Sequence, residues 1–260
     1  MNFTDSHCHL ADPAFQNRLS EILAQAAQQG VTRFIVPATQ RGDWADVVRL
    51  TQTERPSESR IHIALGIHPW FAEAAAPQDF AELERLLRQY PQAWVGETGL
   101  DFLVNRPSET QKQRQVEAFC RQLELAQRLA RPVIVHNVKA TAAVAEAVKQ
   151  SGFTRGGIAH AFSGSMEEAR ILLRCGFKIG IGSLLLNPNA KKVRQAAAQL
   201  DWGDMVLETD SPFMLRDEVN TPANVRTSAE IVAELRGADT AEVAAHTERN
   251  LDILLNREAV

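Results

Sequence analysis

Two histidines near the start of the chain, His7 and His9, have the spacing of a metal site. They end segment 3–9, whose composition is typical of a β-strand. Residues two apart in a strand point to the same face with Cα atoms roughly 6–7 Å apart, so both imidazoles could hold one cation. Cys8 should face the opposite side. Two surface histidines at a strand end are the alternative, and further ligands from elsewhere in the chain would decide for a metal.

Other ligand-type side chains occur at the carboxyl ends of later strand-like segments. They are Glu97, His136, His160 and Asp210, and His68 ends one more such segment. Imidazole and carboxylate without thiolate is the ligand set of a catalytic rather than a structural centre. Four histidines and two carboxylates exceed the needs of one tetrahedral ion with an open position. We therefore predict two divalent cations (Mg, Mn or Zn) per subunit, about 3.5–4 Å apart.

Each predicted ligand has a role in this hypothesis. Glu97 lies between the other ligands in strand order and is predicted to bridge the two ions. One ion is assigned to His7, His9 and Asp210, and the other to His136 and His160.

The predicted chemistry is hydrolysis by water that the two ions activate. Asp210 is predicted to act as general base, and Glu97 is counted with it as catalytic. His68 is predicted to contact substrate, with a hydrogen-bonded rim histidine as the alternative. Glu208 shares a strand face with Asp210 and could support the site or form a buried pair inside the fold.

Strand-like and helix-like segments alternate along the chain and would bring these residues together. The strand-like segments are 3–9, 33–37, 61–68, 93–97, 132–136, 157–160, 177–182 and 205–210. The helix-like segments are 15–29, 43–53, 80–90, 109–130, 141–150, 166–175 and 190–200, and two closing helices are expected in 224–255 with a break near 237–239. A longer loop is expected at 98–108.

Eight such units in 260 residues predict an α/β protein with a closed (β/α)8 TIM barrel, formed as one domain over residues 1–260. The carboxyl ends of the barrel strands meet at one mouth, where active sites are built. An open doubly wound sheet is the alternative, but we find no Gly-rich dinucleotide motif or Walker loop.

Composition narrows the class of protein. Hydrophobic residues make up 45% and charged residues 23%, which is ordinary for a globular protein. A net charge of −4 argues against a strongly basic nucleic-acid surface, although metal ions can supply positive charge locally. The three cysteines form no CxxC pair, so we expect neither a disulfide framework nor a zinc knuckle, and we expect a cytoplasmic protein. We expect no signal peptide, no membrane span and a monomer.

Six motifs together resemble those of the TatD family of metal-dependent hydrolases. They are DSHCHL (5–10), GIHP (66–69), VGETGLDF (95–102), PVIVH (132–136), HAFSG (160–164) and LETDSP (207–212). The resemblance implies an amidohydrolase-like TIM barrel, a two-ion centre and deoxyribonuclease activity, with ligand roles for the same six residues. The chain departs from the family at Asn137 and Val138, where many members carry Ser-Arg, and in segment 216–222. Both changes remove positive charge near the mouth.

Three functions compete on this basis. The leading hypothesis is a phosphodiesterase that degrades DNA from a strand end as a 3′–5′ exonuclease, with RNA left open as a substrate. The second is an amide, lactone or aminoacyl-ester hydrolase with the same centre. Related barrels of that kind often bridge their ions with a carboxylated lysine, whereas the fourth strand here offers Glu97. The third is a barrel that only binds or stores metal or serves as a scaffold, which predicts closed coordination.

Overall fold

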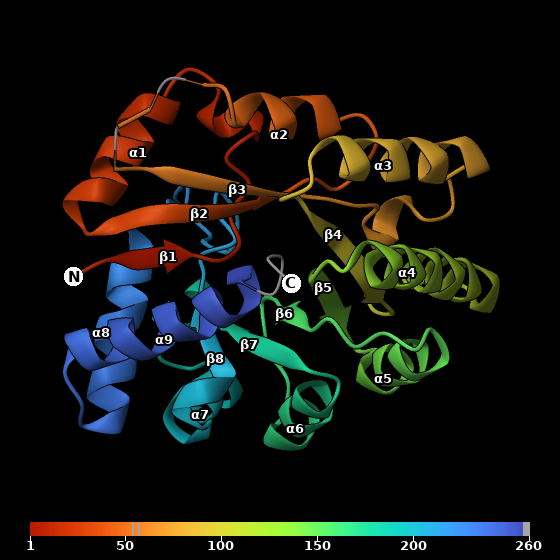
Figure 1. Ribbon diagram of the computed structural model, residues 1–260. Helices are drawn as coiled ribbons and strands as arrows, with labels where there is room; N and C mark the ends of the chain where they lie inside the picture. The colour runs from red at the N-terminus through yellow and green to blue at the C-terminus, as the bar shows by residue number, and fades with distance from the viewer. Residues whose placement is uncertain (54, 57, 257–260) are drawn as a thin grey trace.

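Parallel strands in chain order form the centre of the molecule (Figure 1). The computed structural model describes residues 1–53, 55–56 and 58–256, and within these it has one eight-stranded sheet ordered β1 to β8. The strands are β1 (Phe3–Asp5), β2 (Val31–Pro37), β3 (Arg60–Leu65), β4 (Trp94–Asp101), β5 (Val133–Val138), β6 (Gly157–Ala159), β7 (Phe177–Ile181) and β8 (Met205–Leu207). Every neighbouring pair is parallel, as the alternation of segments predicted.

The first and last strands meet along a seam that closes the barrel. The backbone N–H of Ser6 donates to the carbonyl of Leu207 over 3.0 Å. Just beyond the strands, the N–H of Asp210 donates to His7 O over 2.8 Å, and the N–H of His9 donates to Ser211 O over 2.7 Å. The predicted TIM-barrel fold is therefore confirmed, and the open sheet is excluded.

Helices surround the sheet on its outer side (Figure 1). They are α1 (Leu19–Gln28), α2 (Trp44–Leu50), α3 (Pro77–Gln89), α4 (Glu109–Leu129), α5 (Thr141–Gln150), α6 (Met166–Arg174), α7 (Lys191–Gln199), α8 (Asn224–Arg236) and α9 (Thr240–Leu255). Their starts follow local chemistry: Ser108 and Ser165 each form a capping box that begins α4 and α6. Gly237, with a left-handed φ of 62°, ends α8 and gives the expected break before α9.

The barrel interior is apolar at the end opposite the carboxyl ends of the strands. Inward-facing Ile35, Trp94 and Ile134 are fully buried there. Helix α9 adds Leu251 and Leu254 to the same cluster, so the last helix closes the floor of the barrel (Figure 1). The opposite end is thereby left for polar side chains.

Several predicted boundaries are wrong in ways that matter for the site. His7 and His9 follow β1 rather than lying on it, because the strand ends at Asp5. His68 likewise follows β3, which ends at Leu65. The predicted loop at 98–108 begins later, since β4 continues to Asp101 and pairs with β5 as far as Val138. His136 is therefore inside β5, not at its end.

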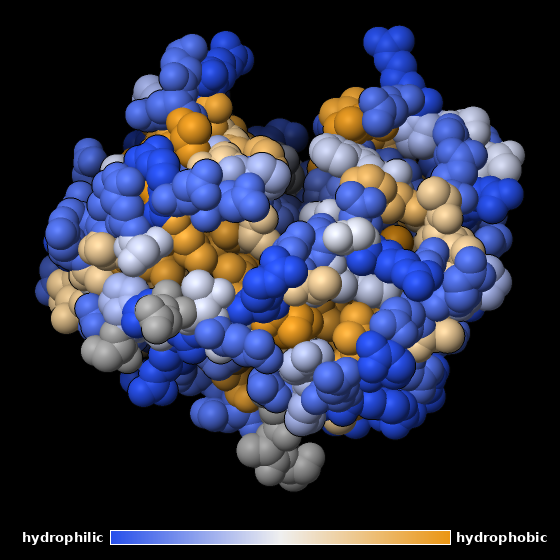
Figure 2. Space-filling model, turned by 90° about the horizontal axis from the view of Figure 1, so that it is seen from above, coloured by the Kyte–Doolittle hydropathy of each residue, from blue (hydrophilic) through white to orange (hydrophobic). Residues whose placement is uncertain are grey.

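The outer surface seen in Figure 2 is mostly hydrophilic, with hydrophobic patches between the charged side chains. Among the described residues, no helix has both the length and the apolar character needed to cross a membrane.

Candidate metal centre

The seam between β1 and β8 assembles one half of the centre. The backbone bonds that join His7 to Asp210 and His9 to Ser211 fix these segments side by side. Asp210 has a left-handed φ of 56°, which turns the chain sharply after β8. As a result, His7 Nε2 lies 3.2 Å from His9 Nε2, and Asp210 Oδ1 lies 3.5 Å and 3.3 Å from these two nitrogens.

Glu97 on β4 connects this half to the other. Its Oε2 lies 3.3 Å from His7 Nε2 and 3.7 Å from His9 Nε2. Its Oε1 points to a second set of imidazoles, with His160 Nε2 at 2.7 Å and His136 Nδ1 at 3.0 Å. A carboxylate whose two oxygens face two separate groups of nitrogens has the position expected of a bridging ligand.

The structure thus brings together all the residues that the sequence singled out as ligands. Three groups, each with ligand atoms within 4.8 Å of one another, could hold an ion. They are His7, His9 and Glu97; His7, His160 and Asp210; and His68, Glu97 and His136.

Two details differ from the division made on sequence. His160 does not belong to one side only, because its ring stacks on that of His7 with centroids 3.8 Å apart. His68, predicted to contact substrate, lies inside the cluster with Nε2 3.2 Å from Glu97 Oε1.

The hydrogen bonds of His68 define which of its nitrogens carries the proton. The backbone N–H of Trp70 donates to His68 Nδ1 over 3.2 Å. A neutral imidazole that accepts at Nδ1 carries its proton on Nε2, so His68 donates to Glu97 in this arrangement. Burial lowers the pKa of His68, which keeps this neutral form.

Electrostatics favour an ionised Glu97 at the centre. Its side chain is only 3% exposed, and burial alone would raise its pKa. The surrounding His160, His68 and His7 instead hold the pKa of Glu97 well below its usual range. The same opposition holds for Asp210: burial alone would raise its pKa, but His9, His7 and His160 together lower it. Both carboxylates are therefore negative at neutral pH and attract cations.

The histidines divide into two kinds. Burial lowers the pKa of His7 to about 4, so this imidazole is neutral and has the form that binds metals. Burial would also lower the pKa of His9 and His136, but nearby carboxylates raise these values to about 8 and about 9. His9 and His136 thus carry protons that offset the negative charge of the nearby carboxylates. A divalent cation would neutralise the same charge, so this set of imidazoles and carboxylates fits divalent metal ions.

Asp101, at the end of β4, holds His136 in place. Its Oδ2 accepts from Trp70 Nε1 at 2.9 Å and lies 3.3 Å from His136 Nε2. Its Oδ1 accepts from the N–H groups of Leu103 and Val104, each at 2.9 Å, so Asp101 also braces this loop. Since Nε2–H of His136 is directed to a carboxylate, Nδ1 is left to face the centre.

Two more buried carboxyl groups lie behind the ligands. Asp5, which sequence reasoning missed, accepts from Thr209 N at 2.9 Å, and burial raises its pKa to about 7. Glu208 is fully buried and accepts from the N–H of Ala161, and burial raises its pKa well above the usual value. Its other oxygen has no hydrogen-bond partner among the described residues. Asp5 begins the DSHCHL motif, but its contact with Thr209 could not be predicted because the two residues lie 204 positions apart.

Known proteins resemble this chain over nearly its full length. A family model described as "TatD related DNase" matches residues 4–256. The uncharacterized metal-dependent hydrolase YjjV of Escherichia coli is 34% identical over 260 residues, covering 98% of each chain. Its crystal structure, described as a TatD homologue, superposes with a TM-score of 0.89 at 33% identity and 98% coverage of both chains. Human deoxyribonuclease TATDN3 is 27% identical over 263 residues, covering 96% of this chain and 93% of its own.

Proposed function

Because the chain belongs to the TatD family of metal-dependent hydrolases, we propose that it cleaves the phosphodiester bonds of DNA with two divalent cations bound around Glu97. The position of Glu97 carries this proposal. One of its oxygens faces His7 and His9, and the other faces His136 and His160. Two ions bridged by a carboxylate are the arrangement used for in-line displacement at phosphorus.

Each half of the cluster would hold one ion. His7, His9 and Asp210 form the first set, and His136 forms the second with His160, whose ring also stacks on His7. When bound, divalent cations supply acidity for the attacking water and neutralise charge on the phosphate and the leaving oxygen.

The residues of the chain supply orientation and a proton acceptor. Asp210 is ionised and its side chain is 15% exposed, so substrate water can reach it from the mouth, and it accepts the proton of the attacking water. Asp101 fixes the ring of His136. His68 donates to Glu97 and keeps this carboxylate oriented between the two halves.

Aromatic side chains at the mouth support a nucleic-acid substrate. Trp70 is 54% exposed and its ring lies 4.8 Å from that of His68. Phe213 is 49% exposed and lies 5.5 Å from the ring of His9. Exposed rings on both sides of the centre can stack on unpaired bases. The name of human TATDN3 describes that relative as a deoxyribonuclease, which also favours this activity.

The test is turnover of DNA by the purified protein. With magnesium or manganese, single-stranded oligonucleotides should release mononucleotides, and labels at each end should report loss from the 3′ end. Asp210→Asn should abolish release while the far-UV spectrum and the melting temperature stay near wild type. Asp252→Asn, an exposed carboxylate on α9, serves as the matched control. No turnover of DNA or RNA with any divalent cation refutes the proposal.

A second candidate is hydrolysis of an amide, a lactone or an aminoacyl ester at the same centre. One observation favours it: Leu103, Val104, Met214 and Val219 are all well exposed on the loops after β4 and β8. Such apolar side chains suit an acyl group better than a phosphate. A panel of amides, lactones and esters, assayed beside DNA with the same metal-loaded protein, separates the two activities.

A further inference from the structure

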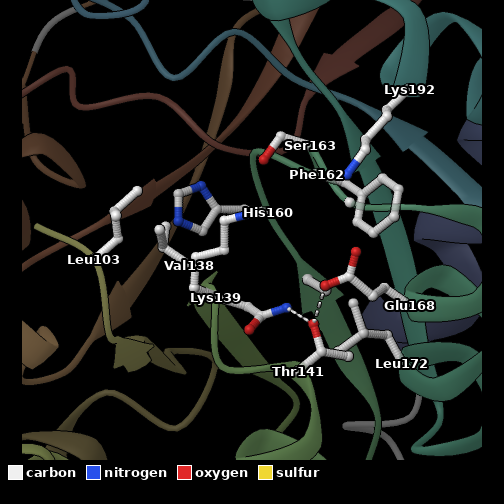
Figure 3. A pocket seen from close by; sticks show the side chains of 13 residues that line it. Leu103, Val138, Lys139, Thr141, His160, Phe162, Ser163, Glu168, Leu172 and Lys192 are labelled. Carbon is white, nitrogen blue, oxygen red and sulfur yellow. Dashed lines mark hydrogen bonds between the residues drawn. The ribbon is translucent and has the colours of Figure 1, made fainter.

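A pocket of about 110 Å³ opens beside the metal centre, next to His160 (Figure 3). Its walls come from the end of β5, the loop after β6 and the first turn of α7, with Leu103 on one side. Ala159 and Leu172 also line the pocket, and both are buried.

Two lysines from separate elements line the pocket. Lys139 follows β5 directly, and Lys192 lies in the first turn of α7. Both are exposed, and within the described part of the chain neither has a hydrogen bond or ion pair. Figure 3 shows the Lys192 amine reaching toward Ser163 and Phe162. Two lysines and a serine hydroxyl that line one pocket are the groups that would bind an anion.

Glu168, the one acidic residue among those that line the pocket, forms no ion pair with either lysine. One of its oxygens accepts from the N–H of Ser165 at 2.8 Å, and the other accepts from Thr141 Oγ1 at 3.3 Å. Thr141 in turn accepts from Asn137 Nδ2 at 2.8 Å. Both carboxylate oxygens of Glu168 are thus hydrogen-bonded within the wall of the pocket, and neither oxygen forms an ion pair with Lys139 or Lys192.

We propose that this pocket binds a terminal phosphate group of the substrate strand through Lys139, Lys192 and Ser163. The inference rests on the proposed nuclease function and extends it to recognition of the strand end. Lysine binds phosphate as a point charge, and two lysines match a phosphomonoester dianion better than an internal diester with a single charge. A water molecule occupies about 30 Å³ in the liquid, so the pocket has room for a phosphate group and the edge of its sugar.

The test measures binding rather than turnover. Three dithymidylates with a methylenephosphonate linkage that resists hydrolysis carry a 5′-phosphate, a 3′-phosphate or neither. Their affinity for the full-length protein is measured by calorimetry, with and without magnesium. One phosphorylated ligand should bind about tenfold more tightly than the unphosphorylated one. The double variant Lys139→Met/Lys192→Met should lose this difference, and the salt dependence of its log Kd should fall by about 0.7 per lysine.

Lys191→Met is the matched control, because Lys191 neighbours Lys192 on α7, is exposed and does not line the pocket. It should keep the preference for the phosphorylated ligand. Equal affinity for all three ligands in the wild type overturns the proposal, as does an equal loss for phosphorylated and unphosphorylated ligands in the double variant. If the protein binds the terminal phosphate through these lysines but turns over no DNA, the proposed function fails and the phosphate site stands.

Discussion

The contact between Asp101 and His136 predicts that the substitution Asp101→Asn weakens metal binding in the half of the centre that contains His136. Asp101→Asn keeps an oxygen for the N–H groups of Leu103 and Val104. It places an amide –NH₂ opposite Trp70 Nε1 and His136 Nε2, which are both donors to the native carboxylate. The imidazole can relieve this clash by moving its proton to Nδ1, and it then loses the lone pair that faces Glu97.

The expected cost follows from the role of carboxylates that hold metal-binding histidines. Removing such a partner lowers metal affinity or activity about 10- to 100-fold, which is about 1.4–2.7 kcal/mol. Titration of the metal-free variant with manganese or zinc, followed by calorimetry, should show one site weakened by this factor. The site that contains His9 and Asp210 should keep its affinity, because neither residue is hydrogen-bonded to Asp101.

A matched control separates metal binding from folding. Asp239→Asn also alters a carboxylate that accepts a backbone N–H, that of Glu242 at the start of α9. Asparagine keeps an oxygen for the backbone N–H groups in both variants, so they should melt within a few degrees of each other. If Asp101→Asn binds both ions within twofold of wild type, the positioning role of Asp101 is wrong.

Three further predictions concern stability. Burial, with Arg33 and Arg60 nearby, lowers the pKa of His62 from 6.5 to about 4. The unfolded state therefore binds a proton at His62 before the folded state does, and folding stability is lost as the pH falls from about 6.5 to about 4. His62→Gln should remove about 2 kcal/mol of the stability change between pH 7.5 and pH 5 in urea unfolding of metal-saturated protein, and an unchanged slope contradicts this. Leu251→Ala should cost about 2–5 kcal/mol in the same assay, because Leu251 fills the barrel floor. In Gly180→Ala the new methyl group would collide with the Glu208 carboxylate, so the variant should lose about 1–3 kcal/mol; wild-type stability would show that the buried carboxylate can move.

The sequence predicted the barrel and the membership of the centre because both depend on local signals. Alternating segments define β/α units, and in a parallel barrel every carboxyl end reaches the same mouth. His7, Glu97 and Asp210 therefore met as expected, although they come from three different strands or strand ends. Their roles as ligands and general base stay predictions.

The remaining features depend on contacts between distant residues. The extension of β4 to Asp101 includes Gly99, whose segment resembles a loop until β5 pairs with it. The hold of Asp101 on His136 and of Asp5 on Thr209 requires knowledge of the folded register. The stacking of His160 on His7 arises from side-chain direction inside the barrel, which chain order does not specify.

The seam between β1 and β8 has a consequence for the order of events during synthesis. The carbonyl of His7 accepts from the N–H of Asp210, which is made only some two hundred residues after His7. A nascent chain that stops before β8 has imidazoles without this carboxylate, and its first strand still lacks one neighbour. Hydrolytic capacity would therefore arise in one step, together with closure of the cylinder.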